Sequence, residues 1–166
     1  MARNLEIKLE LDSFDGLIEK LDSMGASNEG ILNQKDVYYR INDGLLKLRI
    51  QDGENLLIKY NRDESGSDRW SDYDILKLEG DNAEKYLNDI FTVEATVIKE
   101  RKLYLYKDTR IHLDSVTGLG LFLELETVVT SSLDNAKQLF DEMVQQLGLD
   151  TRRQILKSYR DLLMGK

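Results

Sequence analysis

The sequence predicts an α+β domain built as a closed eight-stranded antiparallel β-barrel with helices packed on its outside. Three features of the 166-residue chain support this fold class. Eight segments alternate apolar and polar residues with the period of two that is typical of strands. Most neighbouring strand segments are joined by short turns, which favour antiparallel hairpins over a βαβ sandwich with crossover helices. Four other segments have amphipathic helical spacing, and the length suits a single domain over residues 1–166.

The first strand segment, residues 5–11, shows the alternation most clearly. Its apolar and polar side chains fall on opposite faces, with Leu5, Ile7, Leu9 and Leu11 on one and Glu6, Lys8 and Glu10 on the other. The same pattern predicts further strands at 35–41, 45–50, 55–62, 69–77, 93–106, 109–114 and 120–129. Turn residues at 42–44, 51–54 and 107–108 separate several of them, as hairpins require.

The four helices are predicted from apolar residues at helical spacing. They are expected at residues 13–24, 82–90, 132–147 and 153–164. The third is the clearest, because Ser132 is a good N-cap residue and Gly148 suits the position after the helix ends. Between two strands, the polar residues 63–68 are expected to form a loop, with a lid over the mouth of the barrel as one use.

Composition excludes several kinds of function. The chain has 23 Lys and Arg against 31 Asp and Glu, a net charge of −8, which argues against nucleic acid as a partner. It has no Cys and a single His, which excludes disulfides, thiolate metal sites and multi-histidine metal sites. No apolar run approaches the ~20 residues of a membrane span, and the N-terminus lacks the apolar core of a signal peptide. A cytoplasmic protein without a membrane partner is therefore expected.

Basic residues are concentrated on the polar faces of the predicted strands, although the protein is acidic. They are Lys8, Lys47, Arg49, Lys59, Lys99, Arg101 and Arg110. If these faces point outward, they are solvated barrel exterior, and basic residues on strands also discourage aggregation. This is the interpretation that the pattern alone favours. If they point inward, the converging cations repel one another unless a multiply charged anion such as a triphosphate binds.

Carboxylates share those same polar faces. Glu6 precedes Lys8 on one face, Glu124 and Glu126 lie together on another, and Asp114 shares a face with Arg110. Hard oxygen ligands beside cations suit a phosphate site bridged by Mg²⁺ or Mn²⁺. For Glu124 and Glu126, the pattern alone favours an ordinary strand with one wet face. His112 lies on the face of Arg110 and Asp114, and its pattern favours a structural role over a role in a site.

The motifs along the chain resemble those of the CYTH superfamily, also called triphosphate tunnel metalloenzymes. Near the N-terminus, NLEIK is similar to the family signature E-x-E-x-K, with Asn4 in place of its first Glu. There follow in the family's order QKDVYYRI, LLKLRI, LLIKYNR, RWSDYDI, a D-x-x-x-G-L-G-x-F-x-E motif starting at Asp114, and SYRDLL. The resemblance is strongest to the branch of class IV adenylyl cyclases. It implies an eight-stranded tunnel whose charged side chains point inward.

The resemblance also implies roles for individual residues. The metal-binding residues are expected to be Glu6, Glu124 and Glu126, holding Mg²⁺ or Mn²⁺. The catalytic phosphate ligands are expected to be Lys8, Arg49, Lys59, Lys99 and Arg101. Further substrate-binding residues are Lys47, Arg110 and Asp114. Asn4 lacks the charge of the Glu that it replaces, which bears on the number of metal ions.

The implied activity is the conversion of ATP to cyclic AMP and pyrophosphate. Two alternatives stay open at the level of sequence. One is hydrolysis of an inorganic or thiamine triphosphate in the same site, and the other is a non-catalytic tunnel that only binds nucleotides or polyphosphate. The expected ligand is in each case a small triphosphate such as ATP or tripolyphosphate. A barrel with outer helices can also form a homodimer.

Overall fold

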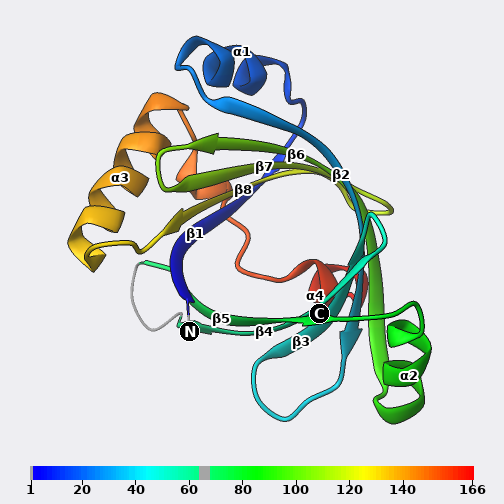
Figure 1. The fold of residues 1–166 in the computed structure, drawn as a ribbon. Coiled ribbons are helices and arrows are strands. Elements are labelled where there is room, and N and C mark those ends of the chain that lie inside the picture. Colours follow the sequence, from blue (N-terminus) through cyan, green and yellow to red (C-terminus); the bar gives the residue numbers. More distant parts are fainter. Residues whose placement is uncertain (1, 64–67) are drawn as a thin grey trace.

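The computed structural model describes residues 2–63 and 68–166, and these form a closed antiparallel β-barrel (Figure 1). Around the barrel the strand order is β1-β5-β4-β3-β2-β6-β7-β8. The strands are β1 (Ala2–Leu11), β2 (Ser27–Tyr39), β3 (Leu45–Gln51), β4 (Glu54–Asp63), β5 (Trp70–Leu78), β6 (Val93–Tyr106), β7 (Thr109–Val116) and β8 (Gly120–Val128). The predicted fold class is therefore confirmed. The predicted loop at 63–68 falls largely outside the described residues.

Strand β1 closes the barrel by pairing with β5 on one side and β8 on the other. The β1–β5 ladder covers only Ala2–Leu5, whereas the β1–β8 ladder runs from Asn4 to Leu11. This second ladder sets Glu6 opposite Glu126 and Lys8 opposite Glu124. Because side chains alternate between faces along a strand, all four point to the same side of the sheet.

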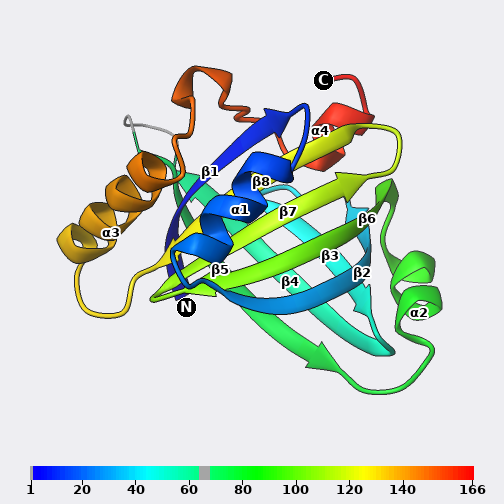
Figure 2. The same cartoon turned by 90° about the horizontal axis from the view of Figure 1, so that it is seen from above.

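Helices lie on the outside of the barrel (Figure 2), and two apolar clusters pack between them and the strands, while a third, with Tyr38 and Phe122, lies inside the barrel. Helices α1 (Asp15–Ser23) and α3 (Leu133–Gln146) cover the outer face of β1, β7 and β8. Helix α2 (Ala83–Ile90) covers β2 and β3 through Leu87, which packs with Val37, Tyr39 and Leu48. Ser132 caps α3 as predicted, because its side chain accepts a hydrogen bond from the Asn135 amide. No helix in the described part of the chain is long and apolar enough to cross a membrane.

The C-terminal segment differs from the helix predicted at 153–164. A short 3-10 helix, η1 (Thr151–Arg153), leads into extended residues, and only α4 (Tyr159–Leu163) is α-helical. Gln154 forms an isolated bridge with Leu9, and the Ile155 amide donates to the Lys8 carbonyl at 2.8 Å. These backbone bonds to β1 replace the helical ones. They bring Tyr159 into the barrel against Phe122, with ring centroids 5.2 Å apart.

Strand β2 begins eight residues before its predicted start at residue 35. The added residues are mostly polar and mostly exposed, and the two apolar ones, Ile31 and Leu32, are adjacent, so they show no clear alternation. They are held as a strand by pairing with β6, which includes a register shift between Asn28 and Gly30. Tertiary pairing therefore overrides the weak local pattern.

Two glycines with the same backbone conformation provide a test of turn packing. Gly44 and Gly53 both have φ of 77°, but a Cβ at Gly44 would meet the Asn61 side chain and come within 2.8 Å of the Tyr60 carbonyl oxygen. At Gly53 the same position is open. We expect Gly53→Ala to lower the free energy of unfolding by ~1 kcal/mol, the cost of a left-handed backbone with a side chain. Gly44→Ala should cost clearly more in urea unfolding, and equal costs would contradict this packing.

Candidate functional site

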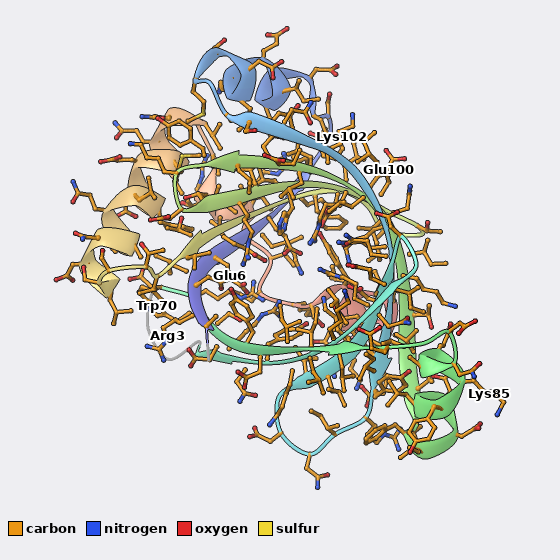
Figure 3. All side chains as sticks on the ribbon, in the orientation of Figure 1. Arg3, Glu6, Trp70, Lys85, Glu100 and Lys102 are labelled. Carbon is orange, nitrogen blue, oxygen red and sulfur yellow. The ribbon has the colours of Figure 1, made fainter. Side chains whose placement is uncertain are left out.

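The inward faces of the strands enclose a cavity of about 250 Å³ lined by charged side chains. Figure 3 shows Glu6 pointing into the barrel, whereas Glu100 and Lys102 on β6 point away from it. Among the described residues, seven cationic side chains and three carboxylates line the cavity. They are Lys8, Lys47, Arg49, Arg62, Lys99, Arg101, Arg110, Glu6, Glu124 and Glu126. The inward interpretation of the charged faces is thus the one that the structure adopts.

One predicted cation does not reach the cavity. Lys59 is exposed on the outer face of β4, and its neighbours Ile58, Tyr60 and Arg62 line the interior instead. In this strand both faces combine apolar and polar residues, so the alternation gives no clear inner side. The prediction for Lys59 is therefore wrong. Arg62, three residues later, is the cation that β4 contributes.

Asp36 on β2 is the centre of one cluster of cations. Its carboxylate is fully buried and accepts bonds from Arg49 Nε and Nη2 at 2.9 and 2.8 Å. Lys47 Nζ and Lys99 Nζ donate to Asp36 Oδ2 at 3.0 and 2.7 Å. Burial alone would raise the pKa of Asp36, but Arg49, Lys47 and Lys99 hold it well below its usual range. One buried carboxylate therefore fixes three of the predicted phosphate-binding side chains.

Glu6 on β1 is the centre of a second cluster. Arg62 Nε donates to Glu6 Oε1 at 3.0 Å, and Arg69 Nε lies 3.5 Å from the same oxygen. Burial raises the pKa of Glu6, and the neighbouring Glu126 and Glu124 carboxylates raise it further, against the opposing effect of both arginines. The three carboxylates are thus close enough to repel one another.

Glu124 and Glu126 on β8 complete this acidic group. Lys8 Nζ lies 3.6 Å from Glu124 Oε1, and Arg110 Nη2 lies 2.9 Å from Glu126 Oε2. Burial opposes ionisation of Glu124, but Lys8 and Arg101 hold its pKa well below the usual range. The Glu124 carboxylate therefore stays charged, and basic side chains balance both carboxylates.

Arg101 on β6 is held by Asp114, the partner across the β6–β7 ladder. Two bonds of 2.7 Å join Arg101 Nε and Nη2 to the carboxylate oxygens of Asp114. Tyr159 Oη donates to Asp114 Oδ2 at 2.8 Å. Asp114, which was predicted to bind substrate, does not line the cavity, and the structure places it behind the wall, where it orients Arg101.

Two lysines of the cavity have strongly lowered pKa values. Burial and the neighbouring arginines lower the pKa of Lys8 to about 8, although Glu124 acts in the opposite direction. Burial and the cations Arg49 and Arg101 lower the pKa of Lys99 to about 7, despite Asp36. The carboxylates near each lysine do not offset the effects of burial and of the neighbouring cations. A bound polyanion would supply the missing negative charge.

The acidic side of the cavity fits a divalent cation. Besides the carboxylates it offers two buried polar atoms with no hydrogen-bond partner among the described residues, Asn4 Oδ1 and His112 Nδ1. Three potential ligand atoms lie within 4.8 Å of one another, one each from His112, Glu124 and Glu126. Burial and Arg101 lower the pKa of His112 to about 4, so its ring is neutral at pH 7 and retains a lone pair.

Sequence reasoning missed Asp36, Arg62 and Arg69 as parts of the site. Asp36 stands in a segment where Val37 and Tyr39 are as apolar as the inward Tyr38, so the alternation hides the acid's direction. A signal was nevertheless present, because three inward cations on neighbouring strands need a buried anion between them. Nothing in the local pattern distinguishes Arg62 or Arg69 from solvent-exposed arginines.

Replacing Asp36 tests the cation cluster. Asp36→Asn leaves Lys47, Arg49 and Lys99 without their common anion, and we expect a loss of about 3–5 kcal/mol in the free energy of unfolding. Added tripolyphosphate should restore the melting temperature of this variant more than it raises that of the wild type. The control is Asp89→Asn, which breaks an exposed pair with Lys85 and should cost less than ~1 kcal/mol. A variant as stable as the wild type would show that the cluster needs no buried anion.

Comparisons with known proteins agree with this architecture. The sequence matches the CYTH domain family over residues 2–159. A Methanocaldococcus jannaschii protein named "putative adenylate cyclase" is 26% identical over 170 aligned positions, which cover 95% of this chain and 97% of the relative.

Solved structures share the fold. A Pyrococcus horikoshii protein, PH1012, superposes with a TM-score of 0.82 at 23% identity, over 96% of this chain and 98% of its own. A "putative adenylyl cyclase" from Hippeastrum, described as having a dominant triphosphatase activity, superposes with a TM-score of 0.71 at 14% identity, over 100% and 97% of the two chains. The chain therefore belongs to the CYTH domain family, whose members are metal-dependent triphosphate tunnel enzymes.

Proposed function

We propose that the barrel binds a triphosphate together with Mg²⁺ or Mn²⁺ and cleaves one of its phosphoanhydride bonds, as an adenylyl cyclase does with ATP. The observation that carries this proposal is the cavity lining, in which seven cations surround three converging carboxylates. The cations suit the phosphate oxygens, and the carboxylates suit the metal ion. The name of the M. jannaschii relative supports the cyclase reaction.

The present ion pairs indicate how metal and triphosphate would assist each other. Lys8, Arg62 and Arg110 now balance Glu124, Glu6 and Glu126. A divalent cation on the carboxylates would take over this balancing, so that the basic side chains are free for phosphate oxygens. Metal and triphosphate should therefore bind with positive coupling.

In the cyclase reaction the ribose 3′-oxygen attacks the α-phosphorus and the bond to the β-phosphate breaks. The products are cyclic AMP and pyrophosphate, and the hydroxyl proton ends on pyrophosphate. Arg49 and Arg101, held rigidly by Asp36 and Asp114, would bind the phosphates and stabilise the charge of the leaving group. The metal ion, when bound, adds Lewis-acid polarisation of the phosphoryl oxygens.

Hydrolysis of an inorganic or thiamine triphosphate is the second candidate. It is favoured by the cavity volume of about 250 Å³, which lies below the 300–1,000 Å³ that is usual for organic ligands. A tripolyphosphate group needs less room than a whole nucleotide. The activity described for the similar Hippeastrum protein supports the same candidate.

Two assays on one preparation separate these functions. Cyclic AMP and phosphate are measured with ATP, tripolyphosphate and thiamine triphosphate, each with Mg²⁺ and with Mn²⁺. Cyclic AMP from ATP supports the cyclase, and phosphate release from the other substrates supports the triphosphatase. Tight binding without any product would contradict catalysis and leave a binding tunnel.

The carboxylate at Glu124 provides a test of metal dependence. Glu124→Gln keeps the size of the side chain and removes its charge, so turnover should fall by at least about 10²-fold if this residue holds the catalytic metal. Binding of tripolyphosphate without metal should be unchanged or tighter, because a repelling charge is gone. The control is Glu100→Gln on the outer face of β6, which should be neutral. Turnover of Glu124→Gln near the wild-type level would place the metal elsewhere.

The lowered lysine pKa values predict proton uptake on binding. At pH 8 Lys99 is mostly neutral and Lys8 is about half protonated, since their pKa values are about 7 and about 8. Bound ATP raises both pKa values, so the two lysines should together take up roughly 1.4 protons at pH 8 and almost none near pH 5.5, where both are already protonated. Isothermal titration calorimetry of ATP binding, in buffers of different ionisation enthalpy, measures the number of protons taken up. EDTA keeps the protein free of divalent metal ions. Lys99→Arg should remove most of the uptake, and proton release by the wild type would contradict the prediction.

A further inference from the structure

We propose that a ring nitrogen of His112 is a ligand of the metal ion, beside Glu124 and Glu126, and that the site therefore prefers Mn²⁺ to Mg²⁺. The inference rests on the proposed function, since it concerns the cation that accompanies the triphosphate. It goes further by adding a nitrogen ligand to a set of oxygen ligands and by naming the metal that such a set selects.

His112 lies on β7 and lines the cavity beside the carboxylates of β8. The β7–β8 ladder sets it directly opposite Glu124, and Arg110, two residues before it, lies opposite Glu126. Its Nδ1 lies 3.9 Å from Glu126 Oε1. The two carboxylates and the imidazole each have a ligand atom within 4.8 Å of the others, which is a span that one ion can bridge.

One ring nitrogen of His112 is buried and unsatisfied among the described residues. His112 is only 5% exposed, and its Nδ1 has no hydrogen-bond partner in the described part of the chain. A buried polar atom without a partner costs about 1–3 kcal/mol, so a histidine with a purely structural role would normally have its nitrogens hydrogen-bonded. Coordination of a metal ion would satisfy this nitrogen at the place where two carboxylates already converge.

The choice of metal follows from the ligand types. Mg²⁺ takes oxygen ligands almost exclusively, with strict octahedral geometry. A first-row transition ion accepts imidazole together with carboxylates, and Mn²⁺ is the member of that series that carboxylate and phosphate oxygens also suit. One nitrogen among the oxygens thus shifts preference from Mg²⁺ towards Mn²⁺.

The composition of the chain makes the test unusually direct. His112 is the only histidine in the sequence, so an untagged preparation contains a single imidazole. Mn²⁺ is added with the bis-methylene analogue of tripolyphosphate, which is not hydrolysed, and the frozen sample is examined by electron spin-echo envelope modulation. We expect ¹⁴N modulation from a bound imidazole, replaced by the ¹⁵N pattern when the protein contains ¹⁵N-labelled histidine.

A variant tests the preference between metals. His112→Gln should abolish the modulation and lower Mn²⁺ affinity at least ~10-fold, while Mg²⁺ affinity changes little. The control is Ser115→Gln, at an exposed position of the same strand, which should bind both metals as the wild type does. If His112→Gln does not fold, the spectrum of the wild type decides alone.

The outcomes separate this inference from the proposed function. Mn²⁺ bound with the analogue but without ¹⁴N modulation would overturn the role of His112 and leave the triphosphate site standing. Equal affinities of the wild type for Mn²⁺ and Mg²⁺ would overturn the proposed preference. No binding of Mn²⁺ in the presence of the analogue would overturn both the inference and the proposed function.

Discussion

The structure depends above all on the burial of charged side chains inside the barrel. Charges removed from water are costly unless they are paired, and here Asp36 and Asp114 pair with Arg49 and Arg101 through two bonds each. The pairing is nevertheless incomplete, because the seven cations lining the cavity outnumber the three carboxylates there and these two aspartates together. The lowered pKa values of Lys8 and Lys99 express the same shortage of negative charge. An anion in the cavity would correct it.

Because much of the interior is polar, most of the apolar core lies on the outside of the barrel, under the helices. Leu5, Ile7 and Leu9 alternate with the cavity residues of β1 and pack with Leu21 of α1 and Met143 of α3. Each such strand therefore serves stability with one face and ligand binding with the other. Asp36 combines both roles on one face. Its carboxylate fixes the binding cations, and it also neutralises charges that would otherwise oppose folding.

The period-two pattern predicted the eight strands, and the motifs predicted which faces are internal. The period-two pattern succeeded where one face of a strand is wholly apolar, as in residues 5–11. It failed at Lys59, because both faces of β4 are mixed and a one-residue change of phase reverses every side chain. The prediction of a C-terminal helix over residues 153–164 was too long for a different reason. Gln154 and Ile155 pair with β1 instead of continuing a helix, and this pairing partner is distant in sequence.

That C-terminal segment also shapes the electrostatics of the cavity. Lys8 Nζ donates to the Lys157 carbonyl at 3.1 Å, Arg69 Nη1 donates to the Ile155 carbonyl at 2.9 Å, and Tyr159 donates to Asp114. The segment thus supplies neutral carbonyl acceptors that hold Lys8 and Arg69 without cancelling their charge. The same segment helps to bury Lys8, because Lys8 Nζ also lies 4.0 Å from the centroid of the Tyr159 ring. Burial is the largest cause of the lowered pKa of Lys8, so the C-terminal segment contributes to that shift.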